Sequence, residues 1–164
     1  MALSLEPPGR RRARSPPLVL NLGSASDANG NYRNVIWTGK YLQSTLMSIE
    51  DEVGLERHPE TDQILIVQEG RGVVKMGARK NRLDAMRRLG VGSAIFVPMG
   101  TWHNIINKGR GLLKLISIYS PPHHPPGLVQ RHAREGDDDE EEEDSEEEEE
   151  DEEDGEYDED DGDE

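Results

Sequence analysis

Any metal ion bound by this chain must be held by nitrogen and oxygen atoms, because the chain contains no cysteine. Glu56 and His58 are two positions apart, and residues with this spacing in an extended segment point to the same face. Together with His103 they would supply two imidazoles and one carboxylate, the ligand set of non-haem iron centres with open positions. These three residues are the first candidates for chemistry.

His103 lies in a segment whose sequence indicates a turn between two strands. Residues 92–107 begin with an apolar run that ends at Pro98, a residue that cannot donate a hydrogen bond to a β-ladder. Gly100 then permits a tight turn, and His103 opens a second strand. This order predicts an imidazole directed from a strand end toward the interior of a barrel.

Short apolar or alternating runs rich in Val, Ile and Leu fill the middle of the chain, and glycines and prolines separate them at hairpin intervals. Eight runs predict strands at residues 18–22, 34–37, 42–49, 64–67, 73–76, 94–97, 104–106 and 112–119. This pattern is typical of a sandwich, a jelly roll or a closed barrel. Residues 79–89 instead predict a helix, because Leu83, Met86 and Leu89 recur every three residues.

The spacing around His103 resembles the second sequence motif of the cupin superfamily. That motif runs Gly, five residues, Pro, one residue, Gly, two residues, His, three residues and Asn, and every fixed position is matched, by Gly92, Pro98, Gly100, His103 and Asn107. The chain is similar to small single-domain cupins of the type-2 group, some of which resemble the cupin half of mannose-6-phosphate isomerase. This resemblance implies an all-β fold, the cupin jelly-roll β-barrel, with a bound divalent metal and His103 among its ligands.

The first cupin motif is present in an altered form. Anchored on Gly70, it places Gln63 at its usual Glu, His58 at its second His and Glu56 at its first His. The substituted side chains can still coordinate, since Glu offers a carboxylate and Gln a carbonyl oxygen. The resemblance therefore implies a metal site of Glu56, His58, His103 and Gln63, with Gln63 as a weak fourth ligand or as a hydrogen-bond partner. The metal would be a divalent transition metal, Fe, Mn, Ni or Zn, and the catalytic residues are unknown.

Two adjacent histidines, His123 and His124, follow the last predicted strand and are flanked by proline pairs. They could extend a metal site, but neighbouring residues in an extended segment point to opposite sides. We therefore interpret residues 120–127 as a proline-stiffened connection that covers a barrel edge or reaches a partner subunit.

The two ends of the chain carry opposite charge. Residues 137–164 hold 24 of the 35 acidic residues and none of the 19 basic ones, which leaves a formal charge of +8 on the remainder. A block of like charge with little apolar surface is expected to remain disordered. We predict a disordered basic arm over residues 1–17, a cupin domain over 18–133 and a disordered acidic tail over 134–164.

Three classes of function remain open from the sequence. The first is a metal-dependent enzyme, of isomerase or dioxygenase type, acting on a small polar or sugar-like substrate. The second is a non-catalytic cupin module that binds a small ligand or sugar. The third is an acidic-tailed chaperone that binds basic proteins through residues 137–164.

The resemblance also implies a homodimer, and the apolar runs bear on where the protein is found. None of these runs is long enough for a signal peptide or a membrane span. We expect a soluble cytoplasmic or nuclear protein that is not secreted and has no membrane partner.

Overall fold

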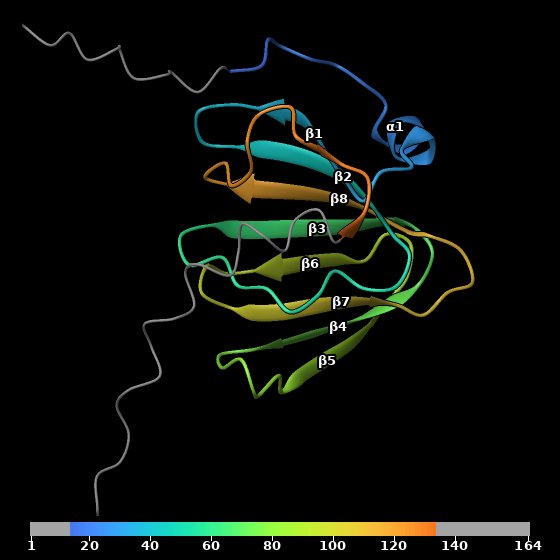
Figure 1. Cartoon of the computed structure of the whole chain (residues 1–164), viewed down its shortest axis with the longest axis vertical. Helices are drawn as coiled ribbons and strands as arrows, with labels where there is room; N and C mark the ends of the chain where they lie inside the picture. The colour runs from blue at the N-terminus through green and yellow to red at the C-terminus, as the bar shows by residue number, and fades with distance from the viewer. Residues whose placement is uncertain (1–13, 134–164) are drawn as a thin grey trace, which may run out of the picture.

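The computed structural model describes residues 14–133, which form one short helix and nine strands (Figure 1). The elements in chain order are α1 (Leu22–Ala28), β1 (Arg33–Thr38), β2 (Gln43–Ile49), β3 (Asp62–Glu69), β4 (Gly72–Gly77), β5 (Ala85–Leu89), β6 (Ala94–Val97), β7 (Trp102–Asn107), β8 (Leu113–Ser120) and β9 (Val129–Gln130). Residues 1–13 of the predicted arm and the whole predicted tail, residues 134–164, lie outside the described residues.

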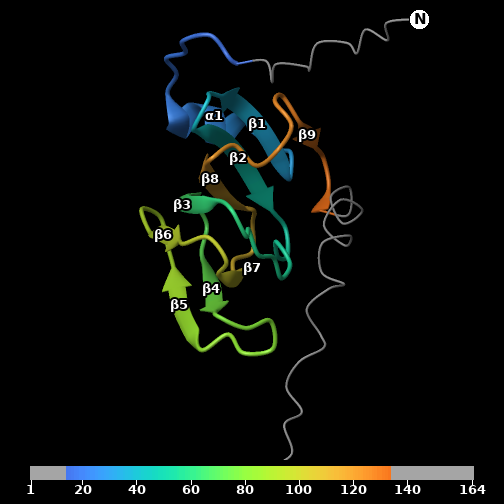
Figure 2. The same cartoon turned by 90° about the vertical axis from the view of Figure 1, so that its left-hand side faces the viewer.

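The strands form two antiparallel sheets, seen from two directions in Figures 1 and 2. The larger sheet has the strand order β6-β3-β8-β2-β1-β9, and the smaller has the order β5-β4-β7. Crossovers between strands that are distant in the sequence, such as the pairing of β3 with β8, are characteristic of a jelly roll. The prediction of an all-β jelly-roll barrel is confirmed.

One end of the barrel interior is a continuous apolar core. Alternate residues of the long central strands point inward, so Ile49 of β2 lies opposite Leu113 of β8, and Val67 of β3 lies opposite Leu115. Val74 of β4 closes this cluster from the smaller sheet, and all five side chains are at most 2% exposed. Burial of this apolar surface is the main favourable term in folding.

The same inward rows become polar at the other end of the barrel. Along β2 the row continues as Thr45 and Gln43, and along β8 it continues as Ser117 and Tyr119. Gln63 of β3 is the cross-strand partner of Tyr119, and all of these side chains are at most 2% exposed. We call this group the polar layer. Burying polar groups costs free energy unless each one finds a partner, so this end of the interior is organised for something other than packing.

Seven of the eight predicted strands overlap observed strands, but the first does not. Residues 18–21 belong to no helix or strand, and Val19 is 99% exposed. Leu22 instead begins α1, because the Asn21 side chain accepts a hydrogen bond from the Ser24 amide and caps the helix. The structure adds the short strand β9, which pairs with β1 and which the sequence pattern did not indicate.

The predicted helix over residues 79–89 is wrong, because the second half of this range is the strand β5. Five backbone positions of β5 pair with β4, from Met76 opposite Ala85 to Gly72 opposite Leu89. Of the three apolar residues that suggested a helix, Leu89 packs in the core whereas Met86 is 60% exposed. Pairing with β4 therefore overrides the three-residue spacing.

The described part of the N-terminal segment is attached to the barrel. Ser15 exchanges hydrogen bonds with the backbone of Thr38, and the Trp37 indole donates to the Pro16 carbonyl at 2.9 Å. No helix among the described residues is long and apolar enough to cross a membrane.

Candidate metal centre

Two backbone segments bring the candidate ligands together. Residues 51–58 form an extended segment that runs antiparallel to β7 and pairs with it at two isolated bridges, Glu52 with Ile106 and Glu56 with His103. The Glu56 amide donates to the His103 carbonyl at 3.0 Å, and the His103 amide returns a bond to the Glu56 carbonyl at 2.9 Å. This pairing makes the two residues direct cross-strand neighbours whose side chains lie together.

The turn before β7 fixes His58 in the same place. Gly100 has a φ of 77°, a conformation that glycine adopts without strain, and its amide donates to the His58 carbonyl at 2.8 Å. The neighbouring Met99 amide donates to Asp62 Oδ1 at 2.8 Å. The turn therefore holds the backbone of His58 and the side chain of Asp62, the two ends of the connection over residues 58–62.

Asn107, the last residue of the predicted motif, holds the far end of β7. Its side-chain amide lies within 3.0 Å of the carbonyl oxygens of Ile49, Glu50 and Gly111, to which it donates. The motif glycine and asparagine thus have a common role, because each secures a loop that flanks the strand carrying His103.

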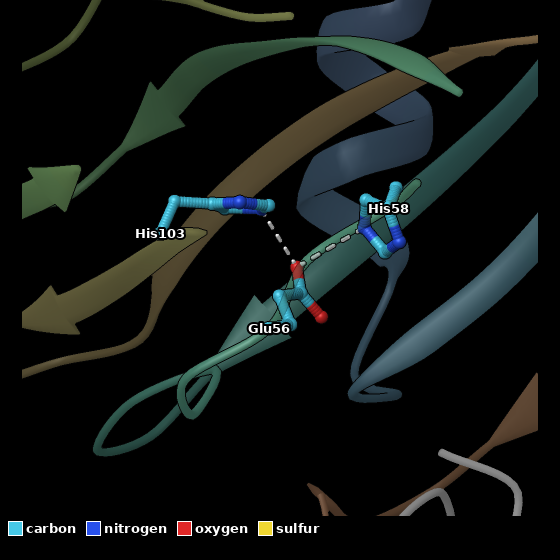
Figure 3. A group of neighbouring side chains, drawn as sticks. All are labelled: Glu56, His58 and His103. Carbon is cyan, nitrogen blue, oxygen red and sulfur yellow. Dashed lines mark hydrogen bonds and ion pairs between the residues drawn. The ribbon is translucent and has the colours of Figure 1, made fainter. Parts of the chain in front are cut away.

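Glu56, His58 and His103 form one buried cluster (Figure 3). One ligand atom from each lies within 4.8 Å of the others, and the residues are 7%, 3% and 0% exposed. His103 Nε2 is 3.1 Å from Glu56 Oε1, and His58 Nε2 is 3.6 Å from the same oxygen. Two imidazoles therefore converge on a single carboxylate oxygen.

The hydrogen bonds of His103 indicate what lies between these atoms. Nδ1 is 3.0 Å from the Thr101 carbonyl, which can only accept, so Nδ1 carries a proton. In a neutral imidazole Nε2 then presents a lone pair, and it faces the lone pairs of Glu56 Oε1 at 3.1 Å. Two acceptors attract each other only through a proton or a cation. A backbone carbonyl that fixes the tautomer in this way is a common feature of metal-bound histidine.

Glu56 remains a carboxylate despite its burial. Burial alone would raise its pKa, but the hydrogen bond with His103 and the proximity of His58 together hold the pKa well below 4.5. Arg33, which is 3% exposed, adds a guanidinium 3.9 Å from Glu56 Oε2. An ionised carboxylate and two imidazoles suit Fe, Mn, Ni or Zn, so the residues present fit a divalent transition metal.

The comparisons with known proteins agree with this architecture. Residues 45–119 match the cupin domain family. The chain is 38% identical over 114 residues to the mimivirus protein L612, a match that covers 68% of this chain and 69% of L612. The crystal structure of BH2720 from Bacillus halodurans has a TM-score of 0.71 at 44% identity, covering 77% of this chain and 93% of that one. This chain belongs to the cupin family.

A second relative of this cupin is longer than the matched region. The Bacillus subtilis protein YrkC is 51% identical over 115 residues, which are 69% of this chain and 62% of YrkC. The chain therefore spans about three fifths of that relative.

Gln63, the remaining predicted ligand of this cupin, lies in the polar layer on β3. Its Nε2 donates to Ser117 Oγ at 2.9 Å, whereas its Oε1 is buried and has no hydrogen-bond partner among the described residues. Its position opposite Tyr119 directs it toward the layer that contacts His58, whose ring centroid is 5.7 Å from that of Tyr119. Coordination by Gln63 stays a prediction.

Sequence reasoning placed His123 and His124 on a covering loop with their side chains on opposite sides, and the structure corrects this. The loop is bound by Gln43 of the polar layer, and both rings contact Tyr119, with 4.7 Å between the centroids of the two histidine rings. His123 is also 4.3 Å from the His58 ring. The loop does not continue as an extended strand, so alternation of side chains does not apply.

Gln43 is the residue that organises this loop. Its Oε1 accepts hydrogen bonds from the amides of His123 and His124, and its Nε2 donates to the His124 carbonyl at 2.7 Å. The sequence offered one signal for this role. Gln43 is a polar residue at an inward-facing position of β2, a strand whose inward residues are apolar toward its other end.

Proposed function

We propose that this cupin binds a divalent transition metal through Glu56, His58 and His103, and uses it as an enzyme acting on a small polar substrate. The observation that carries the proposal is the approach of His103 Nε2 to Glu56 Oε1 at 3.1 Å while Nδ1 is held by the Thr101 carbonyl. A cation bound there would take the place of the proton that otherwise joins these two atoms in a hydrogen bond.

The protein's own residues prepare this centre in three ways. Backbone pairing with β7 holds Glu56 in place, burial excludes bulk water from all three ligands, and the Thr101 carbonyl fixes the tautomer of His103. When bound, the metal would polarise a substrate oxygen as a Lewis acid, or support oxygen chemistry if it is iron. Isomerase and dioxygenase activities are the two reaction types that we propose to test, and a non-catalytic ligand-binding role is the alternative.

Elemental analysis of the untagged protein tests the proposal directly. We expect close to one equivalent of a transition metal per chain, and none in a folded Glu56→Ala, His58→Ala, His103→Ala triple variant. The exposed His132 provides a matched control, since His132→Ala should leave the metal content unchanged. The identity of the metal then selects the assay, sugar isomerisation or dioxygen consumption.

A parent protein that contains no metal, and takes up none on incubation, would contradict the proposal. In that case His103 is an imidazolium and a proton occupies the position assigned to the metal. The two states can be separated by the His103 ring resonances, which shift on metal addition only if the site coordinates.

A separate proposal concerns residues 137–164, which lie outside the described residues. We propose that this segment, with 24 acidic residues and no basic ones, binds basic proteins. The full chain should bind poly-L-lysine at low salt and release it at moderate salt, because exposed charges are screened beyond about 8 Å at 0.15 M ionic strength. Equal binding by a chain that ends at Gly136 would contradict this role.

A further inference from the structure

The region around the metal centre contains buried polar atoms that the protein itself does not satisfy. Among the described residues, His58 Nε2, Gln63 Oε1 and His124 Nε2 are buried and have no hydrogen-bond partner. His58 Nε2 faces the proposed metal, and Gln63 lies in the polar layer beside it. His124, only 8% exposed, has no assigned role. A buried polar group without a partner destabilises the fold, and three such atoms in one region point to a ligand.

Hydrogen bonds and ring packing hold His124 in a defined position. Gln43, which is completely buried, accepts from the His124 amide at 2.9 Å and donates to its carbonyl at 2.7 Å. The His124 ring packs edge-on against Tyr119, with 5.0 Å between ring centroids. The ring of Tyr119 in turn contacts that of His58. A series of ring contacts thus connects His124 to a proposed metal ligand.

The charges near the centre specify the kind of ligand. Among the described residues the buried charged side chains are Arg33, Glu56 and Lys114. Lys114 donates to the Asp27 carbonyl of α1, whereas Arg33 lies beside Glu56. The charges of Arg33 and Glu56 cancel, so a divalent cation leaves about two uncompensated positive charges in a buried site, which is costly. An anion would offset them.

We propose that the centre binds a small hydroxycarboxylate, with its oxygens on the metal and on His124 Nε2. This inference rests on the proposed metal function. Burial, with Arg33 nearby, lowers the pKa of His124 to about 2, so its imidazole is neutral and can donate to a carboxylate or accept from a hydroxyl. The ring of His123 contacts the rings of both His58 and His124, so it connects the two binding positions.

Glycolate and ethylene glycol are matched probes for this inference, since they differ only in the carboxylate. The full chain is loaded with Co(II), and each probe is titrated while the visible absorption of the cobalt is followed. We expect glycolate to shift the spectrum saturably and ethylene glycol to leave it unchanged. His124→Ala should weaken glycolate binding roughly tenfold, the effect of losing one hydrogen bond to a charged group, at unchanged cobalt stoichiometry.

Two further variants separate a binding role from a structural one. His124→Gln keeps a hydrogen-bonding end and should recover part of the lost affinity, and His132→Ala should bind glycolate as the parent does. Circular dichroism checks that each variant folds. If His124→Ala does not fold, the comparison of the two probes on the parent still tests the ligand class, and His124→Gln tests the residue.

The outcomes distinguish this inference from the function on which it rests. A parent that binds no Co(II) overturns the metal function and the inference with it. A parent that binds Co(II) but responds equally to both probes, or to neither, overturns the inference and leaves the metal function intact. If folded His124→Ala binds glycolate with unchanged affinity, His124 does not contact the ligand, and that part of the inference is contradicted.

Discussion

The two ends of the barrel interior are built on the same strands and differ in what those strands present. Toward one end of β8 the inward residues are Leu113 and Leu115, and toward the other they are Ser117 and Tyr119. All four are completely buried. The apolar end forms the hydrophobic core, whereas the polar layer contacts the Glu56 cluster through the rings of Tyr119 and His58. Equal burial with opposite chemistry shows that these inward-facing rows bury polar groups at one end only, as expected of a functional site.

The largest expected effect is loss of metal from the cluster. Glu56→Gln keeps the shape of the side chain but removes the charge that the centre requires. We expect metal affinity to fall by at least about 100-fold, since even partners of ligands contribute 10–100-fold. Competition against a chelator measures the change. Glu60→Gln, at an exposed position, is the control, and comparable losses in both variants would contradict the assignment.

The next effect belongs to the apolar end. Leu115 is completely buried in the core cluster, so Leu115→Ala should lower the free energy of unfolding by about 2–5 kcal/mol through lost burial and the cavity left behind. Denaturant titration measures this loss. Because the change is made outside the polar layer, metal bound per folded chain should not change. A folded variant that loses its metal would show that the two ends are not separable.

A polar-layer substitution should have the reverse pattern. Gln63→Met removes an amide whose Oε1 is unsatisfied and replaces it with an apolar side chain of similar size. Stability should change by less than about 1.5 kcal/mol, because the loss of the hydrogen bond to Ser117 Oγ is offset by removal of the unsatisfied Oε1. Metal affinity should fall nevertheless, because Gln63 is lost as a ligand or hydrogen-bond partner. Denaturant titration measures the change in stability, and metal titration measures the change in affinity. An unaltered metal affinity would show that Gln63 takes no part in metal binding.

The smallest effect is on the pH dependence of stability. Burial is the main cause that lowers the pKa of His124 from 6.5 to about 2. Between these values the unfolded chain binds more protons than the folded one, so the free energy of unfolding decreases as the pH falls below about 6.5. His124→Phe should make this decrease shallower between about pH 7 and 5. An equally steep decrease in the variant would show that His124 is not the group responsible.

The sequence predicted the parts of the fold that depend on local pattern. Alternating apolar runs identified most strands, and the motif around His103 located the turn whose glycine and asparagine secure the site. The helix over residues 79–89 was wrong because the pairing of β5 with β4 is a long-range contact that the spacing of Leu83, Met86 and Leu89 does not contain.

The candidate site was predicted where a motif existed and missed where only tertiary contacts define it. The three clustered ligands were named from spacing and resemblance. Arg33 was missed, and the loop histidines were considered but set aside, because their proximity to the site depends on β1, β2 and the loop of residues 120–127 coming together. Gln43 was the clearest overlooked signal, since a glutamine pointing into a barrel needs partners, and it finds them in the backbone of His123 and His124.

The most direct test of the central claim is an anomalous difference map, measured at the absorption edge of the metal found in the purified protein. The account predicts one strong peak about 2.0–2.2 Å from His58 Nε2, His103 Nε2 and a Glu56 carboxylate oxygen. A peak at any other group of residues, or a map with no peak at this cluster, would contradict it.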